Sequence, residues 1–157
     1  MIMNEECASL YSEISSVFPR TNSPGSGEIT SDEYGDSMKV RLSLAGHKWW
    51  LVDDNIIDQN HLHLPLLTPI AFHYYLPAFL IRSLKHFVPD NETLIFTVYS
   101  LAPFKTSSDA PWFCDRKRQF TPAEVKTVIK FLHCILNDES MYSLYSDAER
   151  GLKKFWV

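Results

Sequence analysis

The sequence is poor in glycine and cysteine and has no excess of basic residues. None of its five glycines belongs to a phosphate-binding loop, because the PGSGE stretch at 24–28 lacks the lysine and the following helix of such a loop. The three cysteines, Cys7, Cys114 and Cys134, form no close pair in the sequence, which favours a reducing compartment over a disulfide framework. The formal net charge of −4 argues against direct binding to nucleic acid, which requires a basic face.

Membrane and metal signals are missing as well. The N-terminal stretch MIMNEECASL is acidic and has no apolar signal core, and no apolar run is long and uncharged enough to span a bilayer. His61 and His63 are two residues apart, but no Cys-x-x-Cys or His-Glu-x-x-His motif accompanies them. We therefore expect a cytoplasmic protein without metal or cofactor. The length of 157 residues predicts one domain over residues 1–157.

The most prominent feature that is present is a long apolar stretch, PLLTPIAFHYYLPAFLIRSLKHF. Thr68 suits an N-cap, and Pro69 suits the first helical position. The following apolar residues cover every side of a helix, which is typical of a buried helix. Pro77 removes a backbone donor and clashes with the carbonyl of His73, so we expect a kink there. The stretch predicts a buried, Pro-kinked central helix over residues 68–87.

Further helices are predicted where apolar residues recur at the helical period. They cover residues 4–18, 51–60, 121–136 and 143–155, and Thr121 and Glu124 form a capping box. Residues 37–45 and 90–101 fit both a helix and a strand; helix is preferred, and the alternative is a short β-hairpin from 38–44 and 93–99. The stretches 19–36 and 102–119 are predicted loops. We therefore expect a mainly α protein, a bundle of five to seven helices around the central helix.

The central stretch also carries a resemblance. Residues 67–80, LTPIAFHYYLPAFL, resemble the signature of a bacterial protein family known only as a domain of unknown function. Its members carry Leu-Thr-Pro-Glu-Ala-Phe-Arg-Tyr-Tyr-Leu-Pro-Ala-Phe-Leu, so Ile70 and His73 replace a Glu and an Arg. The similarity covers most of the chain, continuing at 46–49, 112–113 and 120–132. The resemblance implies helix at 37–45 but no activity, and the two replacements argue against a charge-based mechanism at positions 70 and 73.

Acidic residues are concentrated in one third of the chain. Between residues 28 and 58, seven acids and three bases give a net charge of −4, equal to that of the whole chain. The acids are Glu28, Asp32, Glu33, Asp36, Asp53, Asp54 and Asp58. Trp49 matches the family pattern, so we expect it in the core and expect Trp50 at the surface as an aromatic anchor. The alternative is a solvated acidic face without a partner.

These features lead to three hypotheses for function. The first is a small cytosolic binding protein, an immunity protein that neutralises a cognate bacterial toxin through the acidic residues and Trp50. An acidic inhibitor would associate rapidly with a basic toxin domain. The second is a small hydrolase-like enzyme with a site at the kink, formed by His73, Tyr74 and Tyr75. The third is a regulatory subunit of a larger complex.

Overall fold

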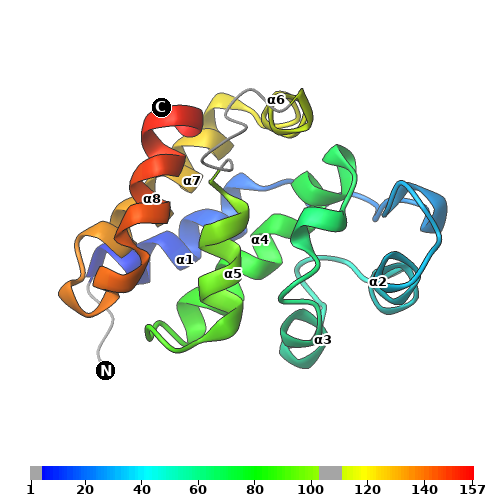
Figure 1. Ribbon diagram of the computed structural model, residues 1–157, viewed down its shortest axis with the longest axis horizontal. Helices are drawn as coiled ribbons and strands as arrows, with labels where there is room; N and C mark the ends of the chain where they lie inside the picture. Colours follow the sequence, from blue (N-terminus) through cyan, green and yellow to red (C-terminus); the bar gives the residue numbers. More distant parts are fainter. Residues whose placement is uncertain (1–4, 103–110) are drawn as a thin grey trace.

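The computed structural model describes residues 5–102 and 111–157 (Figure 1). The described part contains eight α-helices: α1 Glu5–Val17, α2 Asp36–Leu44, α3 Asp54–Gln59, α4 Pro69–Lys85, α5 Glu92–Ser100, α6 Pro111–Arg118, α7 Pro122–Leu136 and α8 Tyr145–Gly151. Short 3-10 turns lie at η1 Ser26–Glu28, η2 Leu64–Leu66 and η3 Glu139–Leu144, and a π-helical turn, η4 Leu152–Trp156, follows α8. The prediction of a mainly α protein is confirmed.

The central helix forms where the sequence predicts it. The Thr68 hydroxyl accepts a hydrogen bond from the Ala71 backbone N–H at 3.2 Å, and Pro69 occupies the first turn. Eleven of the 17 residues of α4 are buried. The helix continues through Pro77 to Lys85, and it contacts α1, α3, α5 and α6. In Figure 1, α4 accordingly lies in the middle of the molecule.

Both segments with two alternative predictions are helical, as α2 and α5, so the alternative β-hairpin does not form. In α2, Val40 and Leu44 are buried, whereas Leu42 is 76% exposed. A strand would point all three side chains to one face, but a helix places only residues four apart together. In α5, the side chain of Asn91 accepts the Thr93 N–H at 3.1 Å and caps the helix. Within the described ranges the only strand-like pairing is one bridge between Thr30 and Leu67.

The expected number of helices, five to seven, is too small by one because of α6. Residues 102–119 are predicted as a loop, yet Pro111–Arg118 is helical; residues 103–110 lie outside the described part. The guanidinium of Arg116 is buried, donates to the carbonyls of Pro65 at 2.7 Å and Leu67 at 3.2 Å, and lies 4.6 Å from the centre of the Phe72 ring. Burial lowers the pKa of Arg116 to about 10. These tertiary contacts hold α6 in place.

The two ends of the chain meet in one core. Helix α1 packs along α7, and the Lys130 ammonium lies 2.9 Å from the Glu13 carboxylate across them. Helix α8 packs on α5 and α7, and the indole N–H of Trp156 donates to the Leu101 carbonyl at 2.7 Å. A Cβ added at Gly151 would lie 3.0 Å from the same carbonyl, so this glycine permits the close approach. In the described ranges, no helix combines the length and the apolar character needed to cross a bilayer.

Candidate functional site

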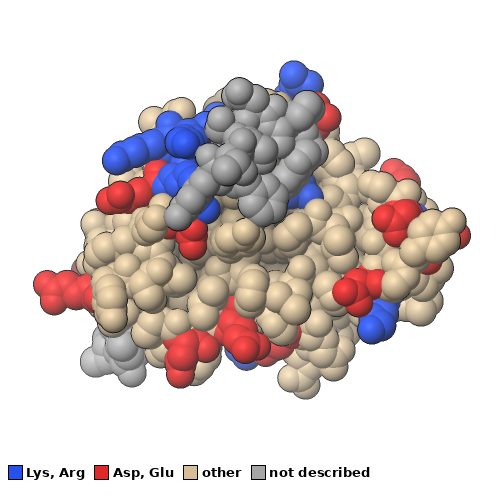
Figure 2. Space-filling view, viewed as in Figure 1, with Lys and Arg blue, Asp and Glu red and all other residues tan. Residues whose placement is uncertain are grey.

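The predicted partner-binding residues lie on and next to η1, α2 and α3; α2 forms one end of the molecule, and α3 lies closer to α4 (Figure 1). The amide of Asn60 donates to the Ser43 hydroxyl at 2.9 Å and joins the end of α3 to α2. Figure 2 shows mainly acidic side chains over the end that α2 forms, whereas a group of basic side chains gathers near the C-terminus. The acidic concentration in the sequence is therefore also a concentration in space, but its members differ in their surroundings.

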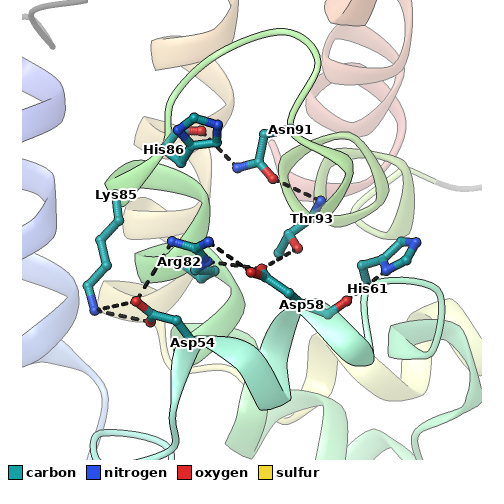
Figure 3. Close-up of polar contacts among 8 residues, drawn as sticks. All are labelled: Asp54, Asp58, His61, Arg82, Lys85, His86, Asn91 and Thr93. Carbon is teal, nitrogen blue, oxygen red and sulfur yellow. Dashed lines mark hydrogen bonds and ion pairs between the residues drawn. The ribbon is translucent and has the colours of Figure 1, made fainter.

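Asp54 and Asp58 are bound within the chain (Figure 3). Arg82 donates to both carboxylate oxygens of Asp58, through Nε at 2.9 Å and Nη2 at 2.8 Å, and the Thr93 hydroxyl adds a third bond at 2.8 Å. The Lys85 ammonium lies 3.1 Å from Asp54. The hydrogen bond from Arg82 holds the pKa of Asp58 below its usual value. These two acids tie α3 to α4 and α5.

The remaining acids are exposed, and they fall into two groups. Glu33 pairs with Arg41 at 3.0 Å, and Asp36 lies 3.5 Å from Lys39. Arg41 is itself buried and also donates to the hydroxyl and the carbonyl of Thr30, so Glu33 borders a structural contact. In the part of the chain that the structure describes, no ion pair involves the other three acids: Glu28, Asp32 and Asp53. Their charges are available to a partner.

The prediction that Trp49 is buried and Trp50 lies at the surface holds for Trp49 but only partly for Trp50. Trp49 is buried, and its indole N–H donates to the Pro19 carbonyl at 3.0 Å, so its assignment to the core is confirmed. Trp50 is half-buried against Trp49. Its ring lies 5.8 Å from the Arg20 guanidinium carbon and 5.5 Å from the Lys48 ammonium. Trp50 was expected to be an exposed aromatic anchor beside acids. The structure instead shows a half-buried ring that two cations approach.

Sequence reasoning missed a set of exposed apolar side chains on α2, on the segments beside α2 and α3, and at the start of α4. Ten large apolar residues are exposed in the described part, and six of them fall between residues 34 and 70: Tyr34, Leu42, Leu51, Leu62, Leu66 and Ile70. Tyr34 is 82% exposed and Leu51 is 70% exposed. Soluble proteins tolerate single exposed apolar residues, but a concentration of them marks a surface that another molecule covers. The sequence offers no signal for this set, because the same residue types form the core.

At the predicted kink, the three candidate side chains are held by tertiary contacts. The Nε2 atom of His73 lies 3.0 Å from both carboxylate oxygens of Glu124, which is almost fully buried. The hydroxyls of Tyr74 and Tyr75 donate to the carbonyls of Thr21 at 3.1 Å and Leu44 at 2.9 Å. Burial raises the pKa of both phenols. This arrangement fixes α4 against its neighbours.

The histidine pair before the central helix is not brought together as a ligand set. His61 Nδ1 lies 2.7 Å from the Asp58 carbonyl, and His63 Nδ1 donates to the Asn60 side-chain oxygen at 2.8 Å. Burial lowers the pKa of His63, so its neutral form is favoured. The described residues contain no group of three or more His, Cys, Asp or Glu side chains that could hold a metal ion.

Comparison with known proteins identifies a family. Neither curated proteins nor solved structures give a match. The model of a family described as "Family of unknown function (DUF6714)" matches residues 8–157, which include the whole LTPIAFHYYLPAFL stretch. The match covers far more than half of the chain. The protein therefore belongs to the DUF6714 family of unknown function.

Proposed function

We propose that this protein binds another protein through the α2–α3 face, which we define as Tyr34, Leu42, Leu51 and Leu62 together with Glu28, Asp32 and Asp53. The observation that carries the proposal is the exposure of these four apolar side chains, each more than half accessible to solvent. Removing one fully exposed leucine side chain from water is favourable by about 1.5–3 kcal/mol, before the entropic cost of association is subtracted. Interfaces combine apolar contacts of this kind with charges at their edge.

The unpaired acids supply the second part of the argument. Glu28, Asp32 and Asp53 are exposed and form no ion pair in the described part of the chain. A basic partner can approach them without breaking an internal salt bridge. Like charges gathered on one face raise the association rate of an oppositely charged partner, and this acceleration decreases with salt. The chemistry of the face therefore suits a basic protein with apolar side chains at its centre.

The most specific form of the proposal is an immunity protein that neutralises a cognate bacterial toxin in the cytoplasm. Support comes from the acidic overall charge and from the mixture of acids and apolar groups on the α2–α3 face. A basic toxin domain would be the partner. A regulatory subunit of a larger complex would use the same face, and it would differ only in the nature of the partner.

The experiment pairs this chain with the product of the reading frame next to its gene. We expect that product alone to stop the growth of a bacterial host and co-expression of this chain to restore it. The Leu42→Lys, Leu51→Lys double variant should lose both rescue and co-purification. Tyr142→Lys is the matched control, because Tyr142 is 75% exposed in η3, away from the α2–α3 face in Figure 1. Equal rescue by all three forms would contradict the proposed face, and a harmless neighbouring product would contradict the immunity role.

A hydrolase-like activity at His73 is the alternative, and the His73–Glu124 pair is the one observation in its favour. A carboxylate that orients a histidine is a common arrangement in acid–base catalysis. The rest of the surroundings favours a structural role, because Phe18 and Phe120 pack on the His73 ring with ring centres 6.2 Å and 4.8 Å away. The variants of His73 described below separate the two roles.

A further inference from the structure

Two hollows adjoin on the side of the molecule where α1 meets the C-terminal half of α4. The first has a volume of about 220 Å³; charged and aromatic side chains, including Arg20, Trp50 and Asp54, line it together with aliphatic ones such as Ile57 and Ile81. The second has a volume of about 420 Å³ and lies beyond the end of α4. Tyr11 and Lys85 line both hollows. The two hollows therefore adjoin at Tyr11 and Lys85, and we refer to them together as the groove, with two chemically different ends.

The first end carries one positive charge in excess. Arg20 forms no ion pair in the described part of the chain, and its guanidinium lies 5.8 Å from the centre of the Trp50 ring. Lys85 is exposed, and its ammonium forms an ion pair with the Asp54 carboxylate at 3.1 Å (Figure 3). Figure 3 shows Lys85 extending along the side of α4 that faces α1. A guanidinium and an ammonium around a small hollow match the two oxygens of a carboxylate.

The second end is mainly apolar. Leu84, Phe87 and Val88 line it, and the first two are buried members of the core. Asp138 also lines it, but its carboxylate already accepts the N–H and the hydroxyl of Ser140 at 2.9 Å and 2.6 Å. An alkyl chain placed along these side chains would be removed from water, which contributes about 0.8 kcal/mol per methylene. Ligand sites typically have this composition, an apolar wall with a few convergent polar groups.

We propose that the groove binds a small amphiphilic carboxylate of the fatty-acid type. The carboxylate lies between Arg20 and Lys85, and the alkyl chain follows Leu84, Phe87 and Val88. The polar hollow is too small for more than the head group and a few atoms, and the apolar hollow takes the chain. None of the residues that define the α2–α3 face lines either hollow, so binding at the groove can be tested independently of the proposed protein partner.

Calorimetric titration with octanoate tests the site directly. We expect saturable binding of octanoate to the 157-residue chain. Binding should be much weaker for acetate, which lacks the alkyl chain, for octanol, which lacks the charge, and for octylammonium, which carries the opposite charge. Arg20→Gln should weaken octanoate binding about tenfold, the loss expected for one charge-assisted hydrogen bond. Lys48→Gln is the matched control, because Lys48 contacts the same Trp50 ring but does not line either hollow.

The apolar end has its own variant. Val88 is half-buried, so Val88→Gln should leave the fold intact while reducing the preference for octanoate over butyrate. Circular dichroism of each variant confirms that it is folded. The proposal is overturned by any of three results: no saturable binding at millimolar octanoate, equal binding of octanol and octanoate, or equal losses in Arg20→Gln and Lys48→Gln.

Discussion

His73 and Glu124 join the two best-defined helices of the molecule, because Nε2 of His73 lies 3.0 Å from each carboxylate oxygen of Glu124. The same carboxylate accepts the backbone N–H of Thr121 at 2.7 Å and completes the capping box of α7. One buried side chain therefore both caps α7 and anchors it to α4. Burial alone would raise the pKa of Glu124, but the hydrogen bonds from His73 and Thr121 outweigh it and lower the pKa.

The first prediction concerns His73. His73→Ala removes the side-chain partner of the Glu124 carboxylate, which keeps only the Thr121 N–H, and should lower the free energy of unfolding by about 2 kcal/mol, the usual contribution of a hydrogen bond to a charged group. His73→Arg is the control, because a permanent cation can still reach the carboxylate and should retain most of the stability. Urea unfolding followed by circular dichroism measures both. An unchanged stability of His73→Ala, together with loss of an activity, would instead favour a catalytic role.

A second prediction concerns acid stability. The pKa of Glu124 is lowered from its ordinary value of 4.5 in the folded state, so its contribution is present above that pH and is lost as the pH falls through the folded pKa. Glu124→Gln cannot titrate, and its stability should depend less on pH below about 4.5 than that of the unaltered protein. Thermal unfolding across the acid range provides the measurement. Parallel curves for the two proteins would contradict the role of Glu124.

A third prediction concerns milder acidification. Burial lowers the pKa of His63 from its ordinary value of 6.5. A histidine that is harder to protonate in the folded state stabilises the protein above 6.5, and this stability is lost as the pH falls through the folded pKa. His63→Gln should therefore flatten the decrease in melting temperature between neutral pH and about pH 5. His47→Gln is the control, because His47 is also half-buried but does not contact Asn60 as His63 does. An equal effect of both variants would contradict the role of His63 in the pH dependence.

The acids near α3 should separate into two functional classes. Asp58→Asn weakens the bidentate contact with Arg82 and should lower stability by about 1 kcal/mol, with little effect on the association rate. Asp53→Lys should do the reverse, because Asp53 is exposed and forms no ion pair in the described part of the chain. Chemical denaturation gives the first effect, and stopped-flow association with the partner at two salt concentrations gives the second. A slower association for Asp58→Asn alone would contradict this division.

For Gly151 we predict that replacement by alanine lowers stability, the opposite of the usual effect in a helix. Replacing a helical glycine by alanine normally stabilises a protein by about 1 kcal/mol. Here the added Cβ would lie 3.0 Å from the Leu101 carbonyl oxygen, so Gly151→Ala should destabilise the protein and disturb the bond from Trp156. Ser146→Ala, at an exposed position of α8, is the control and should be neutral or slightly stabilising. The melting temperature reports on the change; a stabilised Gly151→Ala would show that α8 can move away.

Local signals were sufficient for much of the fold. The caps at Thr68 and Thr121 depend on residues within four positions, so the sequence predicts α4 and α7 nearly to the residue. Contacts between distant residues were not predictable in this way. Arg116 looks like part of a solvated basic run until the carbonyls of Pro65 and Leu67 are placed around it, 51 and 49 residues away. Helix α6 was missed for this reason.

The candidate face shows the same limit. The sequence locates the acidic third of the chain, but it cannot distinguish Asp58 from Asp53, because the partner of Asp58 lies on another helix 24 residues away. It also cannot predict that Leu42 points outward while Leu44 is buried, since the alternating pattern fits a strand equally well. The residues that best define the α2–α3 face, the exposed apolar ones, became recognisable only when their exposure was known.

The pairing of α1 with α7 has a consequence for biosynthesis. Glu13 and Lys130 are 117 residues apart, so the side of the first helix that packs on α7 has no cover until most of the chain has left the ribosome. Helix α1, whose Leu10 and Ile14 are buried in the finished protein, is therefore only partly covered, by α4, during that interval. Contacts of such long sequence separation also slow the final closure, because the intervening chain must be ordered first. Helix α1 therefore reaches its final position only after α7 is made, although it precedes α7 by more than a hundred residues.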